Sequence, residues 1–157
     1  MIFLTVGTQL PFDRFVKIVD EWAAEHPEVE IFAQIGDAEY KPQHMQYCAY
    51  LDEVTYKEKF DQASLVLAHA AMGSIITSLT EQKPVVVFPR LASKGEHRNE
   101  HQLATSKNFE ALDGCYVTYD KTQLLTTLDD VTSLQAGSLG MYANQDLMNS
   151  IESFILA

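Results

Sequence analysis

The strongest constraint on the fold is a pair of short apolar runs, SLVLAH at residues 64–69 and PVVVFP at residues 84–89. Neither run alternates apolar with polar residues, and this indicates strands that are covered on both faces. Between them, apolar side chains recur with helical spacing over residues 74–82. A strand, a helix and another doubly covered strand in this order predict a parallel sheet with a helical crossover.

The same alternation of strand and helix continues along the chain. We expect further strands at 2–6, 29–36, 47–51 and 115–119, and further helices at 12–23, 55–63, 101–112, 121–130 and 142–156. A chain of 157 residues has the size of a single domain. We therefore predict one α/β domain over residues 1–157, with a doubly wound parallel sheet. Ligands of such folds bind beyond the carboxyl ends of the strands.

The charge balance limits the partners. The chain has 11 lysine and arginine residues against 22 aspartate and glutamate residues, a formal net charge of −11. An acidic chain does not offer the extended basic surface that nucleic acids need. We therefore expect no nucleic-acid partner, and any bound phosphate has to be held locally.

The sequence indicates neither a metal site nor a membrane segment. Cys48 and Cys115 lack the CxxC spacing of zinc sites, and no Asp-x-Asp cluster is present. No stretch approaches the roughly 18 apolar residues of a membrane span. The apolar run before Gly7 is too short for a signal peptide. We expect a cytoplasmic protein that needs no metal or cofactor and that reaches a membrane only through a partner.

The segment HAAMGS, which follows the strand at 64–69, has the features of a phosphate-binding turn. Gly73 and Ser74 are placed in the first turn of the next helix, where free backbone amides and the helix dipole favour an anion. Gly73 allows close approach to the backbone, and Ser74 can cap the helix or donate a hydroxyl. An ordinary capped helix explains the same residues. A serine hydrolase is disfavoured, because Ser74 lacks a nucleophile-elbow pattern.

The segment KGEHRNEHQ at 94–102 concentrates polar side chains after the strand at 84–89. Its acceptors and donors suit sugar hydroxyls and phosphate, and the residues concerned are Glu96, His97, Asn99, His101 and Gln102. His69 falls in the neighbouring loop of a parallel sheet. Thr8 and Gln9 extend the pattern to the loop after the first strand. A solvated polar loop is the alternative, and the spacing alone predicts a phosphate-bearing, hydroxyl-rich ligand.

Four segments resemble the C-terminal, donor-binding domain of family 28 glycosyltransferases. They are FLTVGTQLPFDRF, AHAAMGSIITSL, KPVVVFPR and GEHRNEHQLA, in this order, and the resemblance covers residues 2–114. The chain is most similar to single-domain PssE-type subunits, to the cytosolic catalytic subunit of the eukaryotic dolichol-linked N-acetylglucosaminyltransferase, and to the C-terminal half of MurG. The resemblance implies the Rossmann-like half of a GT-B glycosyltransferase.

The resemblance also implies a function and partners. Such a chain binds a UDP-sugar and works with a membrane-associated, acceptor-binding subunit of the PssD type. Together they transfer a hexose, uronic acid or N-acetylhexosamine with inversion, without a metal ion, to a lipid-linked saccharide in exopolysaccharide or capsule synthesis. The apolar stripe in 142–157 is expected to pack on its own domain or to contact the partner. Self-association stays open.

The family pattern assigns roles to the predicted site residues. Gly73 and Ser74 would face the diphosphate, the polar loop at 96–102 would face the ribose and the sugar, and Thr8 would lie near the phosphate or the sugar. Two further residues, Leu51 and Asp52, would lie beside the base. His69 is the candidate within this chain for the catalytic base, although the resemblance places that base more readily on the partner.

The chain departs from the family pattern at two places. Ala71 stands where relatives have a glycine, and Thr77 or Ser78 stands where many relatives have an acidic residue. The second departure leaves Glu96 as the candidate for binding the ribose. Two alternatives to a catalytic subunit remain: a nucleotide-sugar-binding or regulatory module without turnover, and an unrelated enzyme that uses a phosphorylated ligand on the same fold.

Overall fold

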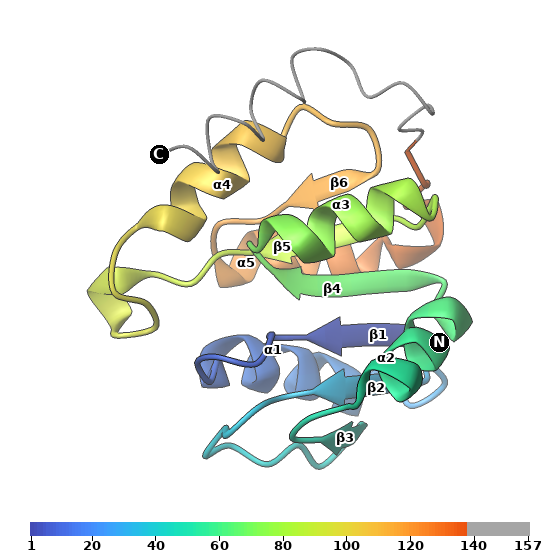
Figure 1. Ribbon diagram of the computed structural model, residues 1–157. Helices are drawn as coiled ribbons and strands as arrows, with labels where there is room; N and C mark the ends of the chain where they lie inside the picture. The colour runs from blue at the N-terminus through green and yellow to red at the C-terminus, as the bar shows by residue number, and fades with distance from the viewer. Residues whose placement is uncertain (138–157) are drawn as a thin grey trace.

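The computed structural model describes residues 1–137, and its centre is a six-stranded sheet (Figure 1). The strands are β1 (Ile2–Thr5), β2 (Ile31–Gln34), β3 (Gln46–Cys48), β4 (Leu65–His69), β5 (Val85–Phe88) and β6 (Cys115–Val117). They lie in the order β3-β2-β1-β4-β5-β6, and every neighbouring pair is parallel. The predicted doubly wound, Rossmann-like α/β fold is confirmed.

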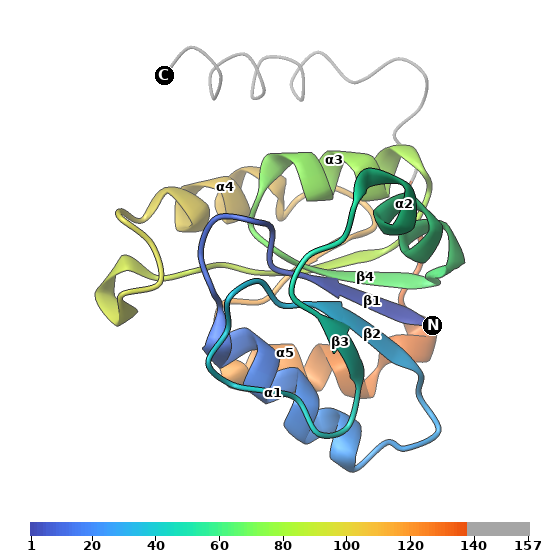
Figure 2. The same cartoon turned by 60° about the horizontal axis from the view of Figure 1, so that its bottom comes forward.

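Helices cover both faces of the sheet. They are α1 (Asp13–Ala24), α2 (Glu53–Gln62), α3 (Met72–Thr80), α4 (His101–Phe109) and α5 (Lys121–Asp129), with short 3₁₀ helices η1 (Ala92–Lys94) and η2 (Val131–Ser133). Figure 2 shows α2, α3 and α4 above the sheet and α1 and α5 below it. None of the helices within residues 1–137 is long and apolar enough to cross a membrane.

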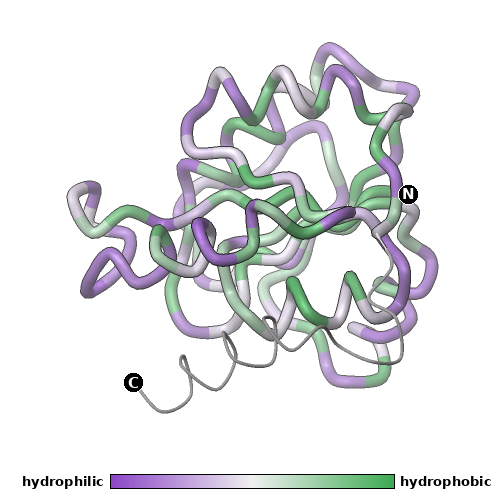
Figure 3. Tube along the Cα trace, turned by 90° about the horizontal axis from the view of Figure 1, so that it is seen from above, coloured by the Kyte–Doolittle hydropathy of each residue, from purple (hydrophilic) through white to green (hydrophobic). Residues whose placement is uncertain are grey.

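Two apolar cores explain why the strands show no alternation. In β1, Ile2 and Leu4 pack on the side of α1 and α5, whereas Phe3 packs on the side of α2, α3 and α4. Each face therefore buries apolar side chains, as a parallel sheet requires. In Figure 3 the tube is mostly green, the hydrophobic colour, at the centre of the molecule and mostly purple on the outside.

The boundaries differ from the sequence prediction at two places that matter for the site. Helix α3 begins at Met72, two residues before the predicted start, because the chain bends tightly after β4 and the Ala71 amide donates to the His69 carbonyl at 2.7 Å. Strand β3 ends at Cys48, short of the predicted end at 51, since it is an edge strand paired with the short β2. The predicted helix at 142–156 lies outside the described residues.

The strand order reverses direction at one position in the sheet, between β1 and β4. From β1 the chain continues to β2 and β3 on one side, whereas β4, β5 and β6 lie on the other side of β1. The strand arrows point to the left in Figure 1, where the segments that follow the strands gather. The gap between the ends of β1 and β4 is the topological switch point, the usual ligand position of such sheets.

Candidate functional site

A polar pocket of about 370 Å³ opens at this switch point. It is lined by the segments after β1 and β4, by Arg90 after β5 and by the start of α4. Of the residues predicted from sequence, the pocket brings together Thr8, Gln9, His69, His97, His101 and Gln102. Segments far apart in the chain thus converge where the sequence analysis expected a ligand.

The first turn of α3 lies next to this pocket. Ala71 and Met72 line it, whereas Gly73 and Ser74 do not. Ala71 is the N-cap residue with extended backbone angles, φ −109° and ψ 132°, and no side chain caps the helix. Of the two roles considered for Ser74, capping of α3 is excluded, because the helix begins at Met72, before this residue. A Cβ placed on Gly73 would meet no atom within 4 Å, so the backbone there is open to a bulky group.

Arg90 is the centre of the polar network under the pocket. Its side chain is buried, with the residue only 3% exposed. The guanidinium donates through Nη2 to the carbonyls of Val6 and Leu10, and through Nη1 to His69 Nδ1 at 2.7 Å. One arginine therefore joins the ends of β1, β4 and β5.

Burial sets the charge states in this network. Burial lowers the pKa of Arg90 to about 10, and the carboxylate of Glu96 opposes this change. The guanidinium is still protonated at neutral pH. Burial, together with the charge of Arg90 and the proximity of His97, lowers the pKa of His69 to about 3. His69 is therefore a neutral imidazole at neutral pH.

Gln102 completes the contacts to His69 from α4. Its Oε1 accepts from the backbone N–H of Arg90 at 2.9 Å, and its Nε2 lies 3.1 Å from His69 Nδ1. Gln102 is buried, with 5% of the residue exposed. Gln102 lines the pocket, but its side-chain amide is already engaged with Arg90 and His69.

Gly7 holds the loop after β1 close to His69. Its φ is +75°, a conformation that side chains disfavour. A Cβ at this position would lie 2.9 Å from His69 Nε2. The loop that carries Thr8 and Gln9 thus depends on glycine for two reasons, its backbone conformation and the space that the imidazole occupies.

Replacing Gly7 by alanine is expected to lower the free energy of unfolding by at least about 1–2 kcal/mol, the cost of a left-handed conformation for an L-residue. The methyl group would also displace the His69 ring. Urea denaturation measures the loss. Gly73→Ala is the matched control, because its added methyl meets no neighbour and its stability should not fall. Equal stabilities of Gly7→Ala and the parent chain would contradict this account of the loop.

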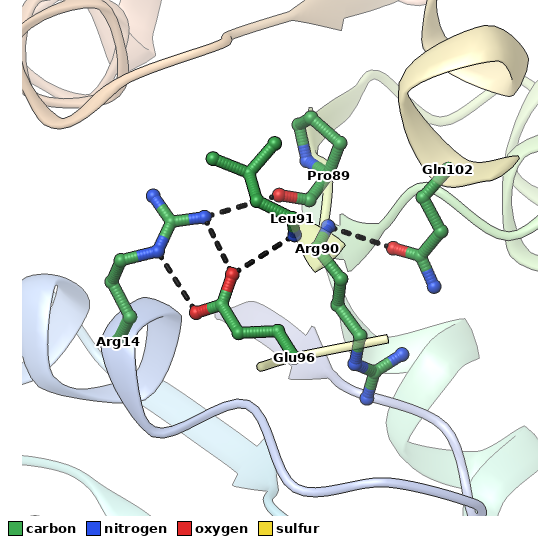
Figure 4. A network of polar contacts seen from close by, with 6 residues as sticks. All are labelled: Arg14, Pro89, Arg90, Leu91, Glu96 and Gln102. Carbon is green, nitrogen blue, oxygen red and sulfur yellow. Dashed lines mark hydrogen bonds and ion pairs between the residues drawn. The ribbon is translucent and has the colours of Figure 1, made fainter. Parts of the chain in front are cut away.

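Glu96 lies outside the pocket lining and holds the loop after β5. Arg14 donates to its carboxylate twice, from Nε to Oε2 and from Nη2 to Oε1, both at 2.9 Å (Figure 4). Its Oε1 also accepts from the backbone N–H of Leu91 at 3.0 Å. The side chain is only 11% exposed. The structure therefore places Glu96 in the scaffold of the loop, where both oxygens are engaged, rather than facing a sugar.

Three hydrogen bonds fix the backbone of residues 89–91, which follow β5. Arg14 Nη2 donates to the carbonyl of Pro89 at 3.2 Å, Gln102 accepts from the N–H of Arg90, and Glu96 accepts from the N–H of Leu91 (Figure 4). These three bonds come from α1, α4 and the loop itself. They fix the direction in which the Arg90 side chain enters the protein.

His97 and Asn99 lie in the loop before α4, whose N-cap is Glu100 and whose first residue is His101. Asn99 Oδ1 accepts from the backbone N–H of His101 at 2.8 Å, and His97 Nδ1 accepts from the N–H of Asn99 at 3.4 Å. His97 and His101 line the pocket, whereas Asn99 does not. The side-chain amide oxygen of Asn99 thus binds the backbone N–H of the first residue of the helix.

Leu51 and Asp52 follow β3 at a separate place and do not line the pocket. Asp52 is the N-cap of α2, where its Oδ1 accepts from the Thr55 N–H at 2.7 Å. Leu51 packs against the core on the side of α2, α3 and α4. Asp52 follows a strand as expected and starts a helix, whereas Leu51, expected as the last residue of the strand, lies beyond its end at Cys48.

The sequence analysis missed Arg90 and Arg14 as parts of the site. Arg90 directly follows the buried run PVVVFP, and a charged residue at the carboxyl end of a doubly covered strand was the signal that could have identified it. Arg14 gave no comparable signal, since it lies among the polar positions of α1.

Comparisons with known proteins agree with this architecture. The profile of the glycosyltransferase family 28 C-terminal domain matches residues 1–150. No curated protein sequence matches the chain closely enough to count as a relative.

Three solved structures share the fold. The solution structure of ALG13 has a TM-score of 0.64 at 17% identity, with 96% of this chain and 93% of that chain covered. The glycotransferase of kitacinnamycin has a TM-score of 0.62 at 20% identity, over 84% of this chain and 34% of that one. MurG of Acinetobacter baumannii has a TM-score of 0.55 at 16% identity, over 96% and 49%.

The lengths differ among these structures. This chain spans about a third of the kitacinnamycin glycotransferase and about half of MurG, but nearly all of ALG13. At such identities the structural similarity establishes the fold alone, whereas the profile match over residues 1–150 establishes the family. The chain belongs to the glycosyltransferase family 28 C-terminal domain family.

Proposed function

We propose that this chain is the UDP-sugar-binding half of a two-component inverting glycosyltransferase. The observation that carries the proposal is the polar pocket at the switch point, which joins Thr8, Gln9, His69, His97, His101 and Gln102 in a member of this family. Such a set offers both donors and acceptors, as a sugar and a diphosphate require. The position beyond the carboxyl ends of β1 and β4 is the usual one for nucleotides in such sheets.

The local charges support an anionic ligand in a chain of net charge −11. The buried guanidinium of Arg90 lies under the pocket, and the amides of the first turn of α3 lie beside it. A helix N-terminus and preorganised donors stabilise the negative charge that develops on a leaving diphosphate. The imidazoles of His97 and His101 line the same pocket and carry N–H donors of their own. We propose that these groups replace a metal ion in stabilising UDP as it departs.

The acceptor side of the reaction is proposed to come from another chain. MurG and the kitacinnamycin glycotransferase are two to three times longer than the part that this chain matches. A membrane-associated subunit of the PssD type would supply the lipid-linked saccharide and the base that deprotonates its hydroxyl, on the cytoplasmic side of the membrane. The proposed product is a lipid-linked saccharide of exopolysaccharide or capsule synthesis, extended by a hexose, uronic acid or N-acetylhexosamine.

One observation keeps a non-catalytic module as the second candidate. Ala71 lines the pocket at the position where the family pattern has glycine, so this chain carries a methyl group there that the pattern lacks. Turnover of a UDP-sugar after co-expression with an acceptor-binding subunit supports the enzyme. Binding of UDP without turnover in every such pairing supports the module.

The nucleotide specificity is tested by thermal denaturation of the purified chain with UDP, ADP and GDP. A ligand at 100 times its Kd adds about 2.7 kcal/mol of stability, which raises the midpoint by roughly 5–10 °C for a chain of this size. We expect this shift with UDP and UDP-sugars, and none with ADP or GDP. Equal shifts with all three bases would contradict a UDP-sugar site and favour an unrelated enzyme on the same fold.

A further inference from the structure

The side chains around His69 determine which of its nitrogen atoms carries the proton. A guanidinium has donors only, so Arg90 Nη1 donates to His69 Nδ1 across their 2.7 Å contact. The orientation of Gln102 is fixed by its Oε1, which accepts from the Arg90 backbone N–H. Its Nε2, 3.1 Å from the same His69 Nδ1, is therefore a second donor. A nitrogen that faces two donors carries no proton, so the single proton of the neutral ring is on Nε2.

The groups that face His69 from each side keep the ring in this state. Arg90 approaches from the end of β5, Gln102 from α4, and Gly7 lies against Nε2 from the loop after β1. His97 is the other titratable group that acts on the ring. Within residues 1–137, none of these contacts is with a carboxylate, and one of them is with the positively charged Arg90. Protonation of Nδ1 would set an imidazolium against the guanidinium of Arg90.

Arg90 is itself held too firmly to adapt to another tautomer. Its Nη2 is anchored on the carbonyls of Val6 and Leu10, its backbone N–H on Gln102, and its guanidinium lies 5.1 Å from the centre of the Phe12 ring. Rotation of the guanidinium would leave the carbonyls of Val6 and Leu10 without this donor, which is unfavourable for polar groups removed from water. These contacts therefore keep the Nη1 donor in a fixed position beside His69.

We propose that Arg90 is a positioning residue that locks His69 as a neutral Nε2–H hydrogen-bond donor at the wall of the pocket. His69 lines the pocket, and its Nε2 is the nitrogen on the side of the Gly7 loop. This assignment rests on the proposed function, in which the ligand is a diphosphate that accepts such a bond. It also removes His69 as the catalytic base, because Nε2 has no free lone pair and Nδ1 is occupied by two donors.

The test is nitrogen-15 NMR of the histidine rings in the full chain, with tautomer and titration read from pH 5 to pH 8. In the parent chain we expect His69 as a single Nε2–H tautomer that does not titrate. Arg90→Lys removes the guanidinium, which binds His69 and the carbonyls of Val6 and Leu10 at the same time. His69 should then titrate or populate both tautomers. The matched control, Arg98→Lys in the exposed part of the same loop, should leave His69 unchanged.

Two results overturn the proposal: an Nδ1–H tautomer in the parent chain, or an unchanged His69 spectrum in folded Arg90→Lys. If Arg90→Lys does not fold, Gln102→Leu replaces it. Loss of that second donor should leave the Nε2–H tautomer in place, since Arg90 remains. An Nδ1–H form in folded Gln102→Leu would assign the lock to Gln102 and refute the role of Arg90.

Titration of the parent chain and Arg90→Lys with UDP separates this inference from the proposed function. We expect the affinity to fall by about 10- to 100-fold in Arg90→Lys, the loss of one hydrogen bond to a charged group. An unchanged affinity would refute the role of Arg90 in ligand binding. If the parent chain shows the expected tautomer but does not bind UDP, the proposed function fails and the structural lock stands.

Discussion

Replacing Arg90 by methionine is expected to lower the free energy of unfolding by about 2–5 kcal/mol. Methionine keeps most of the length of the side chain, but it has no donors and no charge to place over the Phe12 ring. The carbonyls of Val6 and Leu10 would lose the guanidinium that binds them, and His69 Nδ1 would lose one of its two donors. Urea denaturation, monitored by the fluorescence of Trp22, measures the loss.

Arg98→Met is the matched control for this substitution. Arg98 belongs to the same loop but is exposed, so its replacement should change the stability by less than about 0.5 kcal/mol. The comparison separates the loss of a buried network from the loss of a positive charge. Similar effects of the two substitutions would show that Arg90 does not hold the strand ends together.

Replacing Asp20 by alanine is expected to cost about 2–4 kcal/mol, because this carboxylate orders the loop that leads to β3. Asp20 lies on α1 and is 1% exposed. It accepts from Tyr40 Oη at 2.6 Å, from the Gln43 N–H at 3.0 Å and from the His44 N–H at 2.8 Å. Without it, the loop before β3 loses these three hydrogen bonds to α1.

The effect of Asp20 depends on pH in a defined direction. Burial raises the pKa of the carboxyl, but the hydrogen bonds from Tyr40, Gln43 and His44 outweigh burial and lower it below the ordinary value of 3.8. A depressed pKa stabilises the folded state above the unfolded pKa, and this stabilisation disappears as the pH falls through the folded pKa. The difference between the parent chain and Asp20→Ala should therefore be full at pH 7 and shrink below about pH 3.8.

Asp61→Ala is the matched control for Asp20. Asp61 forms an exposed ion pair with Lys57 at 3.2 Å on α2, and such pairs contribute about 0.3–0.5 kcal/mol. Stability curves of the three proteins from pH 2 to pH 7 decide the question. A difference between the parent chain and Asp20→Ala that stays constant down to pH 2 would contradict the role of the ionised carboxylate.

Much of the fold could be predicted from the sequence because the strands are buried on both faces. The runs that became β4 and β5 have no alternation, and this property leads directly to a parallel sheet. The convergence of Thr8, His69 and His97 in one pocket also followed, since the carboxyl ends of parallel strands meet at one edge.

The roles of individual polar side chains could not be predicted in the same way. Glu96 was expected to accept from a sugar, but Arg14, 82 residues away in sequence, occupies its carboxylate. Gln102 was expected to donate to a ligand, but it bridges Arg90 and His69. Such pairings depend on which side chains the folded backbone brings within about 3 Å, and residue type and order do not contain that information.

The central claim, that the pocket between β1 and β4 is the UDP site, is tested most directly by NMR mapping. Nitrogen-15-labelled chain is titrated with UDP, and the shifts of assigned backbone amides are followed. We predict the largest changes at Gly7–Leu10, Ala70–Gly73 and His97–Gln102, beyond the carboxyl ends of the strands. We predict none around Ser64 and Val131, which lie near the amino ends of the strands. Saturable changes confined to the amino ends of the strands would contradict the claim. Equal changes with ADP at the predicted segments would also contradict it.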